Sequence, residues 1–439
     1  MIYNLRILLW TYLVLLIFEG ALRKWIVPFL DTPLLIIRDP LVLWIYILAV
    51  KDQLSFNNVF FLPNFFLAVS TVLIATIFGD GNLAVTMYGV HVNYLQIPLI
   101  FLIPQILNSD DVIVMGRIIL YVTIPMTLLV VAQFRSPVDS LVNKGAFITH
   151  YGTVRPSGTF SFVPGLVAFY SLTASFLLFG FLQPRTYKIW LLVLATICLL
   201  IGADCSGSRS CLIAIGIVLV VAILCVIIRG KGGTGIVIAA AVIALLIPIL
   251  STFSVFQTGF DQLIQRFTDT SAAGEDATGM ANRYVLSMTG PFDDLQDLPL
   301  FGHGLGIGTN AGAALLHGDR EFIGPEDEWG RLFFECGSVF GLLLCLFRLV
   351  LTVAVARYAF NALRRDNVLP LLIFAACGLL ILNGQWGVPT TLGFAIFGAG
   401  ITLAAGVEPP EEEEESDDEE QHEETEDESD HSTAADTVR

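Results

Sequence analysis

Residues 324–331 have the sequence Gly-Pro-Glu-Asp-Glu-Trp-Gly-Arg and lead directly into an apolar stretch, residues 329–354, that is long enough to cross a lipid bilayer. Charged side chains at the mouth of a membrane helix are costly to bury, so they usually have a functional role. This sequence lies within residues 257–337, the one long polar excursion in an otherwise apolar chain. We therefore predict a membrane-embedded helical fold whose functional site lies in this excursion.

The composition indicates a membrane protein. Of the 439 residues, 55% are hydrophobic and 14% are charged, and the mean hydropathy is +0.74. The core of a soluble protein could not bury that much apolar surface, which excludes a soluble globular fold. We expect an all-α, polytopic integral membrane protein.

Apolar runs of about twenty residues cross the hydrocarbon core of a bilayer as single helices. Twelve spans are expected here, at residues 4–19, 34–50, 59–78, 88–107, 112–133, 162–182, 188–203, 209–228, 235–256, 329–354, 368–383 and 389–406. The predicted organisation is a transmembrane bundle of nine spans (1–256), a large extracytoplasmic loop with short helices (257–328), three further spans (329–406) and an acidic tail (407–439).

Basic residues in short loops stay on the cytoplasmic side of a membrane. Arg6, Lys51, Arg185, Arg229 and Arg357 all fall on one side if twelve spans alternate. We therefore predict that both termini are cytoplasmic.

The acidic tail accounts for nearly all of the net charge of -17. Residues 408–439 hold 17 acidic residues and one arginine, so the body of the protein is close to neutral. A segment with this charge and so few apolar residues is expected to be disordered in the cytoplasm, either simply solvated or in contact with a basic partner. We expect no nucleic-acid partner.

Seven cysteines lie in or beside apolar spans, and none are spaced as Cys-x-x-Cys. This pattern is typical of packed free thiols and not of disulfides or a metal site.

The face opposite the termini also carries basic residues, against the usual bias. Its loops contain Arg23, Lys24, Arg135, Lys144, Arg155, Arg266, Arg283 and Arg320, and Arg38, Arg209 and Arg331 lie at helix mouths. Cations in this position indicate a bound anion, and we select Arg155, Arg209, Arg266, Arg283 and Arg331 as candidate ligands. The alternatives are that they are ordinary loop residues that extend to lipid phosphates, and that Arg209 pairs with Asp204 in a capped turn.

Glu326 and Glu328 are the candidate catalytic residues. Crowded carboxylates at a poorly hydrated helix mouth suit a general base that acts on a hydroxyl group. The alternative is that they stabilise the first turn of the helix. Glu335 lies two turns beyond Glu328 and either faces the same interior or pairs with Arg331.

The glycine series at Gly302, Gly304, Gly306 and Gly308 resembles a phosphate-binding turn, but it has no preceding strand and no Gly-Lys-Ser/Thr. A nucleotide site is therefore not expected, and the glycines more simply permit a sharp loop against the membrane. His303, within this series, is a further candidate base or else a plain loop residue. Nothing in the sequence completes a metal site, and we expect no cofactor.

The order of these features resembles the O-antigen ligase and O-antigen polymerase superfamily of bacterial membrane glycosyltransferases. The similar segments are an Arg-containing small-residue turn (207–210), a large loop, the Phe-Gly-x-Gly-x-Gly turn (301–306), and a polar helix start leading to Glu335-Cys336-Gly337. Residues 155–160 also resemble the family's Arg-x-x-Gly-x-Phe segment, and residues 18–25 resemble the start of one subgroup. Together these cover most of residues 1–406, although each motif is short.

This resemblance implies a GT-C-like fold in the bacterial cytoplasmic (inner) membrane with its active site facing the periplasm. It implies transfer or polymerisation of undecaprenyl-diphosphate-linked glycans onto a glycan or lipid acceptor, without a metal or nucleotide sugar. Many members have a His-Asn pair where this chain has Glu326-Asp327. The base is then a carboxylate, Glu326 or Glu328. Arg209, helped by Arg155, Arg266 or Arg283, is expected to hold the diphosphate leaving group in an inverting displacement.

Two other classes of function fit parts of the pattern. A transporter or flippase of lipid-linked oligosaccharides also has about twelve spans, but it should show internal repeats and charges at mid-membrane, and neither is evident in the sequence. A non-catalytic scaffold could act through its acidic tail. The choice between ligase and polymerase, and the identity of the sugars, stays open.

Overall fold

The computed structural model describes residues 2–30, 33–148, 154–272, 277–293, 298–318 and 323–409. These are almost entirely helical, and their only strands are a short antiparallel pair, β1 (Phe147–Ile148) and β2 (Val154–Arg155). The helices are α1 (Ile2–Ala21), α2 (Arg38–Lys51), α3 (Phe61–Phe78), α4 (Leu83–Val90), α5 (Leu99–Ile106), α6 (Ser109–Arg135), α7 (Val163–Leu182), α8 (Ile189–Cys205), α9 (Arg209–Arg229), α10 (Gly233–Leu250), α11 (Ser254–Ala272), α12 (Ala277–Asp293), α13 (Asn310–His317), α14 (Glu328–Arg364), α15 (Leu369–Asn383) and α16 (Pro389–Ala404).

Several of these helices identify a multi-pass membrane protein. Eight described helices are long and apolar enough to cross a membrane: α1 with the turn that follows it, α2 with the turn that precedes it, α3, α6, α7, α9, α10 and α14. The helices α8, α15 and α16 are apolar but shorter. The prediction of an all-α membrane protein is thus confirmed at this level.

The predicted span 88–107 is not one straight helix. It consists of α4, a π-helical turn η4 (His91–Leu95) and α5, and the two halves are bent by 44°. The bend has a physical cause, because His91 and Asn93 in the π-helical turn are buried and contact charged partners on other helices. A π-turn reorients side chains that a regular helix would direct elsewhere.

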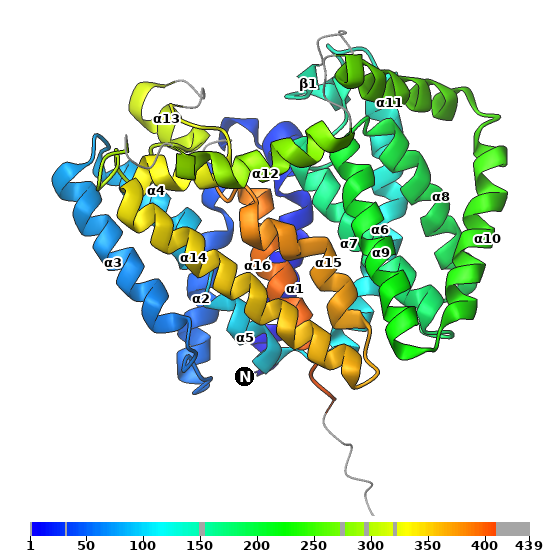
Figure 1. The fold of residues 1–439 in the computed structure, drawn as a ribbon, viewed down its shortest axis with the longest axis horizontal. Coiled ribbons are helices and arrows are strands. Elements are labelled where there is room, and N and C mark those ends of the chain that lie inside the picture. Colours follow the sequence, from blue (N-terminus) through cyan, green and yellow to red (C-terminus); the bar gives the residue numbers. More distant parts are fainter. Residues whose placement is uncertain are drawn as a thin grey trace, which may run out of the picture. The chain divides into compact units, whose positions relative to one another are not determined.

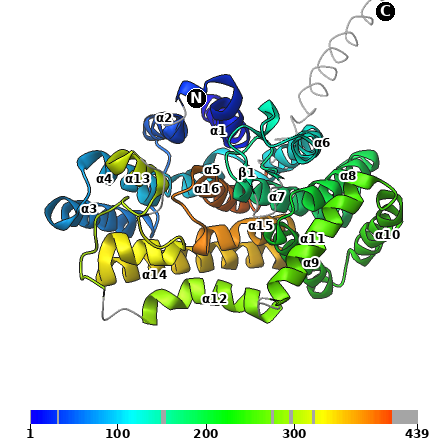
Figure 2. The ribbon, with the colours of Figure 1, turned by 90° about the horizontal axis from the view of Figure 1, so that it is seen from above.

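The centre of the bundle is formed by α7 and α16, which are buried along almost their whole length. Small and β-branched residues on α16 allow its neighbours to approach closely, as is usual where membrane helices pack. In the view from above, α16 lies among α1, α5, α7 and α15 (Figure 2). All seven cysteines are buried free thiols.

Hydrogen bonds join separate segments at each end of the bundle. At the end that holds the N-terminus, Arg6 donates to the Ile106 carbonyl (3.2 Å), and the Ser109 amide donates to the Val407 carbonyl (3.0 Å). At the other end, the Trp25 indole donates to the Leu141 carbonyl (2.9 Å). The polar loops discussed below lie at this second end, with α11, α12 and α13 (Figure 1). Which end is cytoplasmic stays a prediction.

The chain divides into two units, residues 1–407 and 408–439. The prediction of a disordered acidic tail concerns residues 407–439, of which 410–439 lie outside the described part of the chain.

Two glycines allow the loop before α13 to pack closely against the backbone of α14. Gly337 interrupts α14 with a φ of +75°, and Gly302 in the preceding loop has a φ of +68°. A Cβ on Gly337 would collide with the Leu300 carbonyl oxygen, and one on Gly302 would collide with the Gly337 amide nitrogen. The freed α14 carbonyls of Phe334 and Glu335 accept hydrogen bonds from the amides of residues 303 and 304. The glycine series therefore serves close backbone packing.

We expect the substitution Gly337→Ala to destabilise the protein by at least about 2 kcal/mol, because the left-handed conformation is strained for alanine and the added methyl group meets backbone. Thermal unfolding of the purified protein in detergent measures this. Gly216→Ala in α9 is the matched control, since a Cβ there meets no atom within 4 Å. Equal melting temperatures for the two variants would contradict this account of Gly337.

Candidate functional site

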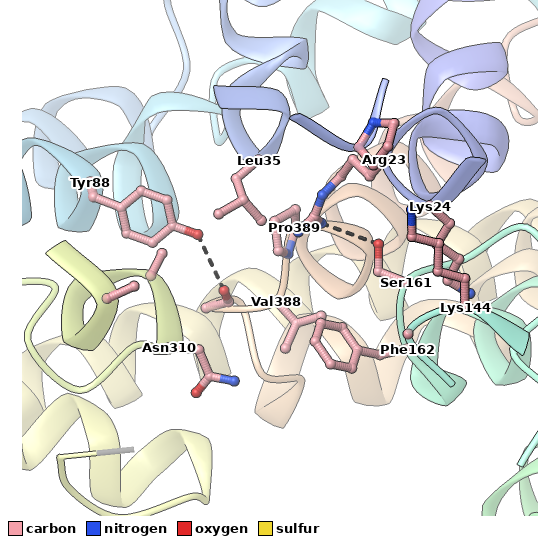
Figure 3. Close-up of a pocket in the computed structure, with 15 residues that line it drawn as sticks. Arg23, Lys24, Leu35, Tyr88, Lys144, Ser161, Phe162, Asn310, Val388 and Pro389 are labelled. Carbon is pink, nitrogen blue, oxygen red and sulfur yellow. Dashed lines mark hydrogen bonds between the residues drawn. The ribbon is translucent and has the colours of Figure 1, made fainter. Parts of the chain in front are cut away.

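A cavity of about 490 Å³ opens among the polar loops at the end of the bundle opposite the N-terminus (Figure 3). This volume is in the range of small-ligand sites. One wall carries the cations Arg23, Lys24 and Lys144, and the rest is mainly apolar, including Leu35 and Phe162. We call it the cationic pocket. Its lining suits a ligand that is both anionic and apolar.

Local structure orients the cations of this pocket. Arg23 and Lys24 lie in the π-helical turn η1 (Leu22–Ile26) that continues α1. Arg23 Nη1 donates to Ser161 Oγ (3.1 Å), and Lys24 Nζ donates to Ser157 Oγ (2.6 Å) and to the Phe160 carbonyl. The turn 155–162 is thereby held against α1. The Lys144 side chain, in contrast, is exposed.

A narrow cleft adjoins the cationic pocket. Its lining includes Glu326, Gln385 and the start of α14, and it shares Asn310, Gly387 and Val388 with the pocket. The two cavities therefore meet along one edge, where α13 faces the connection between α15 and α16.

The three consecutive carboxylates at the start of α14 have three different roles. Glu326 is exposed, and its carboxylate forms no hydrogen bond or ion pair within the described structure. Asp327 is the helix N-cap, and its Oδ2 accepts from the Gly330 amide (2.7 Å). Glu328 is buried. Of the three, Glu326 is the one with neither carboxylate oxygen engaged within the described structure.

Glu328 belongs to an ionic cluster with Arg331, Glu335 and Arg348, all of them buried. Arg331 donates to both oxygens of Glu328 (2.8 and 2.9 Å) and to Glu335 Oε2 (2.7 Å), and Arg348 Nη1 donates to Glu328 Oε1 (2.5 Å). Arg331 Nη2 also reaches Asn93 Oδ1 (2.9 Å). The negative charges of two carboxylates balance the positive charges of two guanidinium groups. This neutrality makes such a cluster tolerable inside a membrane protein.

Residues 384–389 join α15 to α16 and form the shared edge of pocket and cleft; we call them the rim. At one end, Arg348 Nη2 donates to the Gly384 carbonyl (2.8 Å), and its guanidinium lies 3.8 Å from the centre of the Trp386 ring. At the other end, Arg38 donates to the Pro389 carbonyl. The Gln385 amide donates to the Glu326 backbone carbonyl, which ties the rim to the start of α14.

Arg38 is itself part of a second buried network. Arg38 Nε donates to Glu19 Oε2 (2.8 Å), and its Nη1 donates to the hydroxyl of Tyr12 (3.1 Å). Beyond it, His91 Nδ1 lies 2.6 Å from Asp39 Oδ2.

The sequence-predicted arginines fall into three groups. The guanidinium of Arg331 already pairs with Glu328 and Glu335 in the ionic cluster. Arg155 and Arg209 lie near each other at the start of α9, and burial together with the charge of Arg209 lowers the pKa of Arg155. They line none of the cavities described above. The side chains of Arg266 and Arg283 lie outside the described parts of the chain.

His303, the further candidate base, lies with Nδ1 3.0 Å from Asp80 Oδ2, and its ring packs on Phe334. This exposed pair is not part of the lining of the pocket or of the cleft.

No protein-family model, no curated protein and no solved structure matches this chain. Within the described residues, no group of three or more His, Cys, Asp or Glu side chains could hold a metal ion. The chemistry of the site therefore has to be argued from its own residues.

Sequence reasoning did not select Arg23, Lys24, Lys144 or Asn310 as site residues. A signal for the three cations was present, because they were among the basic residues expected on the face opposite the termini. Asn310 had no such signal, since an asparagine at the start of a short helix is common for reasons of capping alone.

We expect Glu328→Gln to destabilise the protein strongly, by about 3–5 kcal/mol, because it leaves the buried guanidinium groups with one carboxylate too few. Thermal or denaturant unfolding in detergent measures this. Asp366→Asn, which removes the exposed carboxylate that pairs with Arg229, is the matched control and should change the stability little. A Glu328→Gln protein as stable as the control variant would show that Glu328 is not ionised in this cluster.

Proposed function

We propose that this protein is a glycosyltransferase of the O-antigen ligase and polymerase type, which transfers or polymerises undecaprenyl-diphosphate-linked glycans. One observation carries the proposal. A cavity with cations on one wall and apolar residues on the others shares an edge with a cleft that holds Glu326, whose carboxylate has no partner among the described residues. A lipid-diphosphate donor needs the first of these features, and activation of an acceptor hydroxyl needs the second.

The proposed reaction is a single displacement with inversion. Glu326 takes the proton of an acceptor hydroxyl, and the hydroxyl oxygen attacks the anomeric carbon of the donor sugar. The bond from that carbon to the phosphate oxygen breaks, and undecaprenyl diphosphate leaves with the electron pair. Arg23, Lys24 and Lys144 stabilise the charge that develops on the diphosphate. These cations take the part that the sequence suggested for Arg209, because they line a cavity and Arg209 does not.

The proposal includes the topology that the family resemblance implies. The bent pair α4–α5 and the shorter helices α8, α15 and α16 would complete twelve crossings with the eight long helices. In a GT-C-like arrangement in the bacterial inner membrane, the pocket would then face the periplasm and the acidic tail the cytoplasm.

We expect Glu326→Gln to reduce glycosyl transfer by at least about 100-fold, the usual contribution of a general base. The assay uses purified protein in liposomes, with lipid-linked glycan extracted from a strain that lacks the protein, and follows the product by gel and mass spectrometry. Asp110→Asn, at the start of α6 and exposed, is the matched control. Full activity of Glu326→Gln would refute the assignment of the base.

The double variant Arg23→Gln, Lys144→Gln should lose transfer by about 100-fold or more, because donors to a developing oxyanion contribute at least that much. Lys51→Gln, which replaces an exposed lysine at the C-terminal end of α2, should retain activity. Arg209→Ala in the same assay separates the two cation sites. If Arg209→Ala abolishes transfer and the double variant does not, the diphosphate binds at Arg155 and Arg209 instead.

The same assay distinguishes transfer from transport. A flippase would move the lipid-linked glycan across the bilayer and form no new glycosidic bond. In the deletion strain, accumulated single repeat units would indicate a polymerase, and accumulated long chains would indicate a ligase. Full activity after deletion of residues 408–439 would exclude a scaffold that acts through its tail.

A further inference from the structure

We propose that Asn310 is a positioning residue that binds the transferred sugar at the edge where the cationic pocket meets the Glu326 cleft. This inference rests on the proposed function and deepens it, since it assigns the sugar subsite.

Asn310 is placed at the boundary between the two cavities. Of the three residues that line both, Asn310 is the one with a hydrogen-bonding side chain; the others are Gly387 and Val388 of the rim. It is the first residue of α13, directly after the N-cap Thr309. Figure 3 shows its side chain between α13 and Val388.

The Asn310 amide is available for a ligand. Its Oδ1 is buried, yet it accepts no hydrogen bond within the described structure. A buried polar atom without a partner is costly and rare, and a bound ligand is one way to satisfy it. The amide offers one acceptor and two donors, a combination that suits neighbouring hydroxyl groups of a sugar ring.

Most of the other polar groups at this edge already have hydrogen-bond partners. Thr309 Oγ1 accepts from the Gly312 amide (2.9 Å) and donates to the Gly306 carbonyl (2.8 Å). Glu328 and Arg331 are saturated within the ionic cluster. Gln385 donates through Nε2 to the Glu326 backbone carbonyl. Among the described residues, this leaves the Asn310 amide, the Gln385 amide oxygen and the Glu326 carboxylate to meet a ligand here.

The proposed reaction requires a sugar at this point. The anomeric carbon must lie between the leaving diphosphate and the acceptor hydroxyl held by the base. If the diphosphate occupies the cationic pocket and the hydroxyl is at Glu326, the ring that carries that carbon lies across the shared edge, next to Asn310. An amide that fixes the ring there favours the geometry of attack.

The fold does not depend on the Asn310 side chain. The Gly308 amide donates to Glu335 Oε1 (3.1 Å), and Thr309 packs against Gly387. These contacts fix the backbone before α13 without the amide of Asn310. Substitutions at this position therefore test binding of the sugar and not the stability of the loop.

The experiment compares Asn310→Ala and Asn310→Leu with the wild type in liposomes. Asn310→Leu keeps the approximate size of the side chain, adds no charge beside the diphosphate and removes the hydrogen-bonding groups. Two quantities are measured: turnover of lipid-linked glycan, and affinity for undecaprenyl diphosphate, which has no sugar. We expect turnover to fall about 10-fold to 100-fold in both variants, the effect of one or two lost hydrogen bonds, with affinity for undecaprenyl diphosphate unchanged. Asn57→Ala, in the exposed α2–α3 connection, should alter neither quantity.

The outcomes separate this inference from the proposed function. If both Asn310 variants keep wild-type turnover while Glu326→Gln loses it, the sugar subsite is wrong and the proposed function stands. If affinity for undecaprenyl diphosphate falls as much as turnover, Asn310 contacts the diphosphate or supports the fold, and the inference is overturned. If Glu326→Gln and the Arg23, Lys144 double variant both keep full turnover, the proposed function itself fails. Should Asn310→Ala not fold, the same comparison is decided by Asn310→Leu.

Discussion

The edge between the pocket and the cleft depends on two buried arginines. Arg348 holds the Gly384 carbonyl at one end of the rim, and Arg38 holds the Pro389 carbonyl at the other. A guanidinium group inside a membrane protein is tolerable when a carboxylate pairs with it, and Glu328 and Glu19 supply those partners. The ion pairs therefore set the position of the rim, and the rim sets how closely the two cavities approach each other.

The π-helical turn η4 connects the two networks that contain these arginines. Its Asn93 accepts from Arg331 of the ionic cluster, and its His91 lies against Asp39 beside Arg38. Just beyond the turn, Gln96 accepts from Tyr12 (2.7 Å) and donates to Asp39 (3.2 Å). This short irregular segment and the residue that follows it thus reach Tyr12 on α1 and charged partners on α2 and α14. A regular helix over residues 88–107 would present these side chains at a different angle, so the bend is a requirement of the polar network.

The sequence predicted the helices well and the site only in part, for identifiable reasons. A run of about twenty apolar residues has the length of a helix that crosses a bilayer. Each predicted span therefore has a helical counterpart. The bend within 88–107 was missed because its cause lies in partners far away in the chain, such as Arg331 for Asn93. For the same reason the sequence could not choose between Glu326 and Glu328. The residue that helps to neutralise Glu328 is Arg348, which lies deep within the following apolar span and gives no local sign of that pairing.

Glu326 differs from its neighbours because its backbone is fixed while its carboxylate has no partner among the described residues. The backbone around it is tied by the Asp327 N-cap and by the hydrogen bond from Gln385, while the next residue, Glu328, is anchored in the ionic cluster. All of these contacts use backbone groups or other side chains, so none of them occupies the Glu326 carboxylate. In the proposed reaction, these contacts would fix the backbone of the base and leave its carboxylate unpaired, which is the arrangement that preorganised catalysis requires. On this proposal, the four buried charges of the cluster support the backbone at the edge where the two cavities meet.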